Sequence, residues 1–300
     1  MAITPQEAAQ AILRRQAARD RLLPFVEYTH PCWGSGAHHR RICEAMEKFE
    51  SGEIRRLMIF APPRCSKSEI ASRRFPAWYL GRHPDHQVIS ASYGDELAHD
   101  IGQDVRDILR DPYYQHIFPG VELRADSQAA GRWRTTGGGI YVAAGVGGPI
   151  VGRGAHRAII DDPIKGREQA DSLRMREIAW RWYWGNLHTR LMPGGGILLM
   201  MTRWHVDDLA GRLLKTEGEL WTVLEMPAIS KEDTEQPEAL WPEWFPLSEM
   251  RQLRGQMTKA GRMREWYAQY MQRPTVDQGT YFRREWFAER WKHGDATRVA

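Results

Sequence analysis

The sequence predicts an α/β fold in which helices cover both faces of a mostly parallel sheet. Short apolar runs of strand length, such as 57–60 and 87–92, alternate along the chain with stretches of helical character. This alternation is typical of parallel sheets, whose strands are connected by helices that pack on the sheet faces. The chain has 300 residues, which is enough for one large domain with an appendage, or for two domains.

The composition is that of a globular protein with a full hydrophobic core. Hydrophobic residues make up 42% and charged residues 27%, and no apolar run approaches the length of a membrane span, so we expect no membrane partner. The three cysteines, Cys32, Cys43 and Cys65, lack metal-ligand spacing, which argues against a zinc site or a disulfide scaffold. The net charge of +4 permits nucleic acid as a partner but does not demonstrate it.

Capping residues and helix breakers define the expected helices. Thr4 and Glu7 form a capping box with Pro5 at the first helical position, so a helix should run from there to about residue 20. We expect Pro24 to end whatever follows that helix. Further helices are expected over 38–49, 68–80, 95–110 and 169–191, after His205 to about Thr216, and near 248–272.

The expected strands are short. They lie at 57–60, 87–92, 157–161, 197–201 and 221–226. The glycine-rich segment 131–155 predicts a hairpin followed by a flexible loop. From about residue 230 the sequence becomes acidic and rich in proline and tryptophan, which indicates a smaller second unit or a linker.

Residues 57–68, LMIFAPPRCSKS, have the pattern of a phosphate-binding loop. A short apolar strand leads into a tight turn, and Lys67 and Ser68 then open a helix, so that backbone N–H groups and a helix N-terminus face the phosphates. In such a loop Lys67 reaches the β- and γ-phosphates and the Ser68 hydroxyl holds Mg²⁺. Ala61 and Ser66 stand where glycines are expected, and Ser66 resists the positive φ that glycine accepts freely. The alternative is an incidental strand–turn–helix with a surface lysine.

A second candidate element is the pair Asp161–Asp162, which ends the predicted strand 157–161. Nucleotide hydrolysis needs one carboxylate for the Mg²⁺ shell and a neighbouring carboxylate that orients and deprotonates water. We assign the first role to Asp161 and the second to Asp162. The alternative is a simple Asp-Asp-Pro turn after a strand.

Three further residues complete the candidate site. Thr202 follows the predicted strand 197–201, at the edge where open α/β sheets bind ligands, and is expected either to contact the attacking water or the γ-phosphate, or simply to cap the strand. Arginine neutralises the charge that develops on a transferring phosphoryl group. Arg64 lies within the loop itself, and Arg153 lies between two glycines, a setting suited to reaching a neighbouring subunit. Solvated surface positions are the alternative for both arginines.

These elements, in this order, resemble the large terminase subunit of tailed bacteriophages, the ATPase that drives DNA into procapsids. The likeness covers nearly the whole chain. It rests on APPRCSKSEIASRRFPAWYLGRHPD (61–85), VISASYGDELAHDIGQDVRDIL (88–109), AIIDDPIKGREQADS (158–172), ILLMMTRWHVDDLAGRLL (197–214) and YMQRPTVDQGTYFRREWF (270–287). The family usually has PPR-x-G-K-S in the loop and Glu as the catalytic carboxylate, where this chain has Cys65-Ser66 and Asp162.

The resemblance implies a P-loop NTPase fold of the ASCE type, a three-layer sandwich that binds ATP and Mg²⁺. It implies that Arg64 acts in cis, that Arg153 acts in trans and that Thr202 couples hydrolysis to motion. Loop residues 63–68 would bind the nucleotide, namely Pro63, Arg64, Cys65, Ser66, Lys67 and Ser68. Adenine contacts in the family come from the segment before the loop, so His39 and Tyr28 are candidates, although His38 and His39 together also fit a solvated helix face.

The resemblance also implies a domain plan and partners. We expect an N-terminal helical arm at 1–35, an ATPase core at 36–230, and a linker or lid subdomain at 231–300 that leads to a nuclease domain outside this chain. The expected partners are double-stranded DNA, the small terminase subunit, the portal protein and further copies of the chain in a ring on the portal. The expected location is the host bacterial cytoplasm and, transiently, the procapsid portal vertex.

Contacts with DNA phosphates would come from arginines, for which solvated helix faces are the alternative role. The candidates are Arg73, Arg74, Arg132, Arg134, Arg174, Arg176 and Arg181. Two other functions remain open from the sequence. One is a helicase-like ATPase that remodels nucleic acid, and the other is a nucleotide-dependent scaffold with little hydrolysis, suggested by Ser66 and by the missing glutamate.

Overall fold

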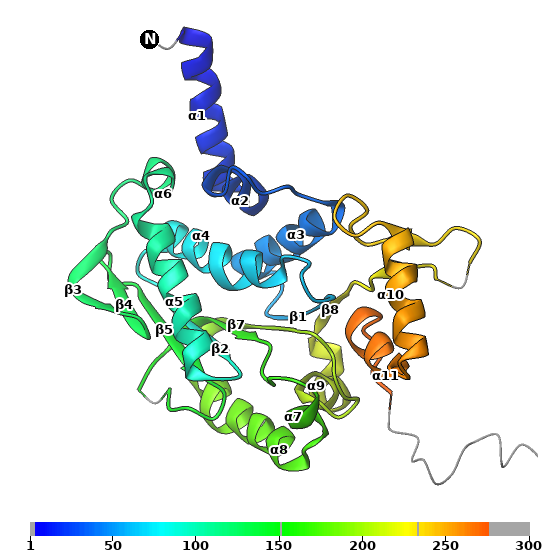
Figure 1. Cartoon of the computed structure of the whole chain (residues 1–300). Helices are drawn as coiled ribbons and strands as arrows, with labels where there is room; N and C mark the ends of the chain where they lie inside the picture. Colours follow the sequence, from blue (N-terminus) through cyan, green and yellow to red (C-terminus); the bar gives the residue numbers. More distant parts are fainter. Residues whose placement is uncertain (1–3, 151, 233, 276–300) are drawn as a thin grey trace, which may run out of the picture.

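A computed structural model describes residues 4–150, 152–232 and 234–275 (Figure 1). The first half of the chain contains α1 (Pro5–Asp20), α2 (Leu22–Thr29), α3 (Ala37–Ser51), β1 (Arg56–Phe60), the π-helical η1 (Glu69–Arg74), α4 (Phe75–Arg82), β2 (Gln87–Ser92), α5 (Asp95–Arg110), α6 (Pro112–Ile117), β3 (Leu123–Ala129), β4 (Arg132–Thr135) and β5 (Ile140–Gly145).

The second half begins with the strand that carries the aspartate pair. It contains β6 (Ala155–Asp161), α7 (Arg167–Asp171), α8 (Leu173–Trp182), η2 (Tyr183–Leu187), η3 (His188–Arg190), β7 (Leu191–Met201), α9 (Leu209–Glu217), η4 (Gly218–Leu220), β8 (Thr222–Glu225), β9 (Ile229–Ser230), β10 (Glu238–Ala239), α10 (Leu247–Lys259), α11 (Met263–Glu265) and η5 (Trp266–Tyr270).

Eight strands form one sheet in the order β3-β4-β5-β2-β6-β7-β1-β8. The six strands from β5 to β8 run parallel, and the edge strands β3 and β4 are antiparallel to their neighbours. Strand β7 lies between β1 and β6, as in P-loop NTPases of the ASCE type. The carboxyl ends of β1, β7 and β6 therefore lie side by side, at the end of the sheet that we call its carboxyl edge.

Two hydrophobic layers enclose this sheet, so the predicted three-layer architecture is confirmed. Along β1, Leu57 and Ile59 pack into the layer that contains α3, α4 and α5, whereas Met58 and Phe60 pack into the layer that contains α8 and α9. This alternation follows from the two-residue period of a strand. Both faces are buried, which explains why β1 is apolar at consecutive positions.

Most of the predicted strands and helices are confirmed. The predicted strands 87–92 and 157–161 correspond to β2 and β6, and the predicted helix 95–110 is α5. The capping box at the start of α1 is present, because the Thr4 hydroxyl accepts a hydrogen bond from the Glu7 N–H and the Glu7 carboxylate accepts one from the Thr4 N–H.

Two predictions about helix ends are wrong. Pro24 ends nothing, because it lies in the first turn of α2, where a missing N–H costs no hydrogen bond. The single helix predicted at 169–191 is broken, since Ser172 caps a new helix by accepting the Met175 N–H. Beyond it, Pro193 belongs to the irregular start of β7, where strand register with β6 shifts and a proline is tolerated. Helix α6 and strand β3 were not expected.

The two ends of the chain pack differently. Helix α1 projects from the body of the molecule (Figure 1), whereas Leu22, Phe25 and Val26 of α2 belong to the main core. A separate small hydrophobic cluster forms near the other end, around Trp266 and Met271, with residues of α10 packed against it. This cluster fits a small C-terminal unit. The domain boundaries remain interpretations, and residues 276–300 of the expected linker lie outside the described part.

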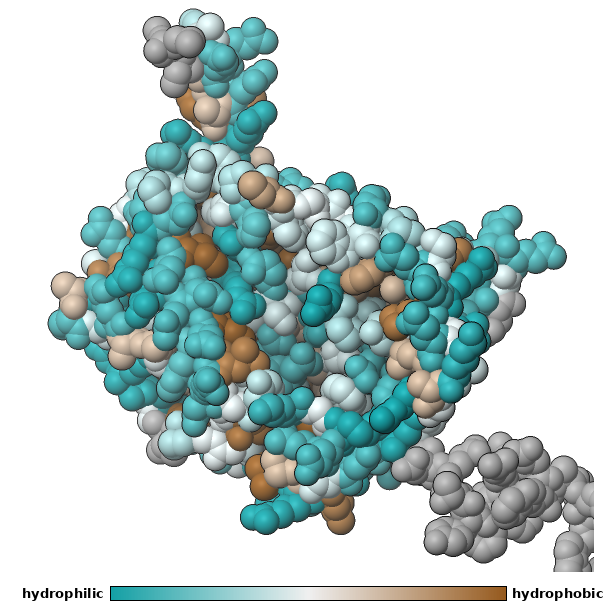
Figure 2. All heavy atoms as spheres, in the orientation of Figure 1, coloured by the Kyte–Doolittle hydropathy of each residue, from teal (hydrophilic) through white to brown (hydrophobic). Residues whose placement is uncertain are grey.

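The face of the molecule in Figure 2 is mostly polar. Figure 2 shows a face dominated by hydrophilic side chains, with apolar groups gathered only in small separate patches. Within the described residues, no helix combines the length and the apolar character that crossing a bilayer requires.

Candidate nucleotide-hydrolysis site

The loop between β1 and η1 adopts an unusual backbone conformation. Arg64 has φ 62° and Ser66 has φ 56°, so two residues with a Cβ occupy the left-handed region that glycine favours. Ser66 therefore adopts the positive φ that glycine would accept freely, at a cost in backbone strain. The Trp33 indole N–H donates a hydrogen bond of 3.4 Å to the Ser66 hydroxyl, which links this loop to the segment before α3.

Lys67 is buried, and its ammonium group lies among polar groups from two other strands. Its Nζ donates a hydrogen bond of 3.0 Å to Thr202 Oγ1 and lies 3.6 Å from Asp162 Oδ2. Thr202 follows β7 and Asp162 follows β6, so the sheet edge brings the three predicted residues together. The predicted grouping of Lys67 with Thr202 and Asp162 is therefore present in the fold.

Asp161, the last residue of β6, is buried next to Asp162. Its two carboxylate oxygens accept hydrogen bonds from the Ser68 hydroxyl at 3.3 Å and from the Ser72 hydroxyl at 2.7 Å. Burial, and secondarily the charge of Asp162, raise the pKa of Asp161 to about 6, against the opposing effect of Lys67. Ser68 and Asp161 together offer the oxygen donors that Mg²⁺ prefers, so these two residues fit the predicted metal role. Ser72, on η1, is a further partner that sequence reasoning missed.

Asp162 has the more open position of the two aspartates. It has a left-handed φ of 46°, and the Thr202 backbone N–H donates a hydrogen bond of 2.7 Å to Oδ1. The other oxygen faces Lys67, and 31% of the side chain is exposed. A carboxylate that is held by a backbone hydrogen bond and remains partly exposed can orient a water molecule.

A buried ion pair anchors the loop that follows Thr202. Arg203 Nε lies 2.9 Å from Asp208 Oδ2, and the Arg203 guanidinium also stacks over the ring of Phe60, the last residue of β1. Asp208 caps α9 by accepting the Gly211 N–H. Both ion-pair partners were missed as site residues, although an aspartate three residues before a glycine at the start of a predicted helix could have indicated the cap.

The two candidate arginines lie in different places. Arg64 is exposed on the phosphate-binding loop. Arg153 precedes β6 and therefore lies at the opposite edge of the sheet from the aspartate pair. β6 has seven residues, which at about 3.3 Å per residue separates Arg153 from the site of its own chain by roughly 20 Å. A role in cis is excluded for Arg153 by this distance, and the predicted role in trans stays a prediction.

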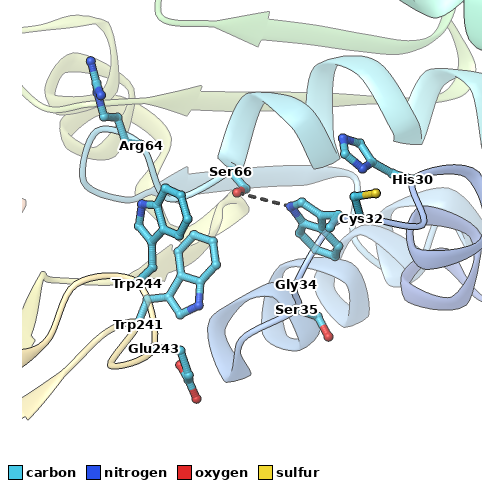
Figure 3. A pocket seen from close by; sticks show the side chains of 10 residues that line it. His30, Cys32, Gly34, Ser35, Arg64, Ser66, Trp241, Glu243 and Trp244 are labelled. Atoms are coloured by element: carbon cyan, nitrogen blue, oxygen red, sulfur yellow. Dashed lines mark hydrogen bonds between the residues drawn. The ribbon is translucent and has the colours of Figure 1, made fainter.

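A cavity of ≈ 670 Å³ lies beside the phosphate-binding loop (Figure 3). Its lining comes from the loop, from the segment before α3 and from the turn before α10, and comprises His30, Cys32, Trp33, Gly34, Ser35, Arg64, Ser66, Trp241, Glu243 and Trp244. The tryptophans of this cavity were not among the predicted site residues. The sequence contains 13 tryptophans, and nothing in their spacing singles these out.

The predicted base contacts occupy other positions. His39 is buried between Trp33 and Trp241, with ring centroids 4.5 and 4.6 Å away, so it supports residues of this cavity without lining it. The alternative of a solvated helix face for His38 and His39 is wrong, because both rings are buried. Tyr28 lines a separate cavity between α1, α2 and α6.

Two further predicted loop residues, Pro63 and Cys65, do not line the cavity beside the loop. Cys65 is buried, and burial raises the pKa of its thiol to about 11, so this side chain is an inert packing group. Together with Pro63 and Tyr270, it lines a small cavity between the loop and the C-terminal unit.

The sheet order and this grouping of lysine, serine and aspartates define a P-loop NTPase. The family model described as terminase large subunit, T4likevirus-type, N-terminal, matches residues 58–289, and the chain belongs to this family. Comparison with the curated protein sequences gives no match.

Solved structures of large terminases share the fold. The large terminase of bacteriophage HK97 superposes with a TM-score of 0.52 at 14% identity, covering 84% of this chain and 54% of that chain. An arginine-to-alanine mutant of the ATPase domain from Thermus phage P74-26 superposes with a TM-score of 0.52 at 12% identity, covering 81% of this chain and 95% of that domain. The chain thus spans about half the length of the HK97 protein and nearly all of the isolated ATPase domain.

Proposed function

We propose that this chain is the ATP-hydrolysing motor domain of a phage large terminase and that it drives double-stranded DNA into a procapsid. The observation that carries the proposal is the position of the Lys67 ammonium group, which contacts both Thr202 and Asp162, next to the buried Asp161. Membership of the terminase family and the fold shared with terminase ATPase domains support it.

Each side chain has a role in this proposal. Lys67 binds the β- and γ-phosphates, and Ser68 and Asp161 hold Mg²⁺, which neutralises phosphate charge when it is bound. Asp162 orients the attacking water and accepts its proton. Thr202 donates its backbone N–H to Asp162 and accepts from Lys67, so a change at the γ-phosphate reaches the Arg203–Asp208 pair and α9.

In this proposal Arg64 and Arg153 act on nucleotides bound by different subunits. Arg64 belongs to the loop and acts in cis, whereas Arg153 acts on a nucleotide bound by the neighbouring subunit. A residue donated by a neighbour requires a head-to-tail interface, which favours a ring of copies. Activity should then depend on protein concentration, because an isolated subunit lacks the arginine of its neighbour.

DNA contacts are proposed on β4, the strand next to the edge strand β3. The candidates Arg73 and Arg176 are engaged by Asp104 and Asp207, at 2.6 and 3.3 Å. In contrast, no ion pair joins Arg132 or Arg134 to another described residue. Burial and the nearby guanidinium groups of Arg153 and Arg134 lower the pKa of Arg132. Arginines that form no close ion pair within the described residues suit DNA phosphates.

The assembly that this function requires has the partners of a packaging motor. We propose that the small terminase subunit and the portal protein join DNA and further copies of this chain at the procapsid portal vertex. Before assembly, the protein would be present in the host bacterial cytoplasm.

Phosphate release tests the hydrolysis step. Mg²⁺-dependent release should rise with protein concentration for the parent and be abolished in Lys67→Ala at every concentration. Equal inactivity of both proteins at concentrations where the parent associates would favour the nucleotide-dependent scaffold. Strand separation of an oligonucleotide duplex would favour the helicase-like alternative over a duplex translocase.

A mixing experiment tests the role of Arg153. Chains with Arg153→Ala retain Lys67, and chains with Lys67→Ala retain Arg153, so a mixed ring contains some complete sites. Partial recovery of phosphate release on mixing is expected. Failure to recover, with assembly of the mixture verified by light scattering, would contradict a trans role.

A further inference from the structure

We infer that the cavity beside the phosphate-binding loop binds the nucleotide base, and that Trp244 of the C-terminal unit stacks on it. This inference rests on the proposed function, because it assumes that the phosphates lie on the loop. It adds a contact that neither the loop motif nor the aspartate pair indicates. The bound nucleotide would then join the core of the protein to its C-terminal unit.

The position of the cavity carries the first step. Ser66 and Arg64 of the loop form part of its wall, so the cavity is continuous with the phosphate-binding segment. A nucleotide whose phosphates lie on the loop directs its other end toward the neighbouring space. The cavity volume of ≈ 670 Å³ falls within the range of small-molecule sites and accommodates a nucleoside.

The exposure of Trp244 carries the second step. Its relative exposure is 61%, although it is one of the largest apolar side chains in the protein. Its ring stacks on Trp241, with centroids 5.5 Å apart and an interplanar angle of 24°, and Figure 3 shows the two indoles side by side at the cavity wall. Trp241 therefore holds the Trp244 ring in place while much of Trp244 stays open. A planar base has the shape and polarisability that such a surface binds.

The support behind Trp241 shows that the tryptophan pair is held in a fixed place. The buried rings of His38 and His39 pack against Trp241, with centroids 5.2 and 4.6 Å away. Gly36, which precedes α3, leaves room for the indole, since a Cβ there would lie 3.0 Å from Trp241 Cδ1. The C-terminal unit is thus seated on the start of α3, and a preorganised stacking surface binds with little loss of side-chain entropy.

The arrangement has a consequence for the motor. Trp33 contacts Ser66 from the core side of the cavity, and Trp241 and Trp244 belong to the turn before α10. A base bound between them adds a contact between two parts of the chain that already meet through Trp241 and through the ion pairs Arg264–Asp171 and Arg167–Glu265. Nucleotide binding and release would therefore strengthen and weaken the attachment of the C-terminal unit.

Binding measurements with two probes test the inference. Isothermal titration calorimetry should compare ATP with inorganic tripolyphosphate, which has the phosphates but no base. In Trp244→Ala the dissociation constant for ATP should rise at least fivefold, since stacking on a base contributes about 1–3 kcal/mol. The affinity for tripolyphosphate should be unchanged, and Trp244→Phe, which keeps an aromatic ring, should retain most of the parental ATP affinity.

Two controls separate this inference from the proposed function. Leu220→Ala removes a side chain of similar exposure (59%) outside the cavity and should leave ATP binding unchanged. Lys67→Ala should lose both probes. If Trp244→Ala binds ATP like the parent, or loses ATP and tripolyphosphate equally, the stacking role is wrong although the ATPase proposal stands. If the parent binds ATP no better than Lys67→Ala does, the proposed function itself fails.

Discussion

Lys67 and Thr202 meet at the carboxyl edge of the sheet through a buried hydrogen bond of 3.0 Å, although 135 residues separate them in the chain. The contact exists because β7, which leads into Thr202, lies directly beside β1, which leads into the phosphate-binding loop. Thr202 also donates its backbone N–H to Asp162. Thr202 therefore contacts both Lys67, which we propose binds phosphate, and Asp162, the proposed base.

Replacing Thr202 tests whether its hydroxyl takes part in turnover. Thr202→Val keeps the size of the side chain but removes the acceptor for Lys67. A hydrogen bond to a charged group contributes about 1.5–3 kcal/mol, so kcat for ATP hydrolysis should fall by about tenfold or more. Thr202→Ser, which keeps the hydroxyl, should stay near the parental rate. Parental kcat in Thr202→Val would show that the residue only caps the strand.

Replacing Asp162 tests its role as the proposed base. Asparagine tolerates left-handed backbone, so Asp162→Asn removes the charge with little disturbance of the φ of 46°. We expect kcat to fall by about 10²-fold or more while ATP still binds, measured by phosphate release and by calorimetry. Asp162→Glu, which restores a carboxylate, should be clearly more active than Asp162→Asn. Equal activity of the two variants would argue that no carboxylate is needed at this position.

The strained serine in the loop offers a stability test. Ser66→Gly should relieve the cost of a positive φ and stabilise the fold by about 1 kcal/mol, after allowance for the extra freedom of glycine in the unfolded chain. For a chain of this size the unfolding midpoint should rise by about 2 °C, measured by calorimetry. Ser66→Ala, which keeps a Cβ at the same φ, should show no such gain. A lower midpoint for Ser66→Gly would mean that the contact with Trp33 outweighs the strain.

The buried pair of Arg203 and Asp208 should matter strongly for stability. Arg203→Leu leaves the fully buried Asp208 without a counter-charge, so we expect a loss of about 3 kcal/mol in the free energy of unfolding. Chemical denaturation measures this loss. The control is Arg124→Leu, which breaks an exposed, solvent-screened pair with Asp126 and should change the free energy of unfolding far less. Similar losses in the two variants would contradict the anchoring role of Arg203.

Acid should destabilise the fold through the histidines behind Trp241. Burial lowers the pKa of His38 to about 4 and that of His39 to about 3, from ordinary values near 6.5. As the pH falls from about 6.5 to 4, the unfolded chain takes up protons that the folded chain does not, so stability declines. His38→Phe removes one of these sites, and its free energy of unfolding should fall less steeply over this range.

The comparison with the parent isolates this effect. The pKa of Asp161 is raised to about 6, which stabilises the fold as the pH falls through that value, but this contribution is common to parent and variant. Equal pH slopes for His38→Phe and the parent would exclude a contribution from His38.

The local elements were predictable because their signals lie close together in the chain. The Thr4–Glu7 capping box, strand β2 and helix α5 each follow from a few neighbouring residues. The break at Ser172 was missed because a cap inside a run of helical periodicity gives little signal. Helix α2 was missed because Pro24 looks like a breaker until its place in the first turn is known.

The candidate site was predictable for its polar residues and not for its aromatic ones. Lys67, Asp161 and Thr202 each follow an apolar strand, and the carboxyl ends of parallel strands meet at one edge, so their proximity follows from fold class. Trp33 and Trp241 come together through packing between distant segments, and no local pattern marks them among 13 tryptophans.

The sequence by itself therefore determined the fold class, the strand–turn–helix segment around Lys67 and the residues that gather at the carboxyl ends of the strands, because hydrophobic periodicity and turn chemistry are local properties. The tertiary structure alone decided that β7 lies between β1 and β6, that Arg153 lies at the far edge from its own site, and that Trp241 rests on two buried histidines. These relationships depend on strand order and on long-range packing, which arise only when the whole chain buries its apolar surface together.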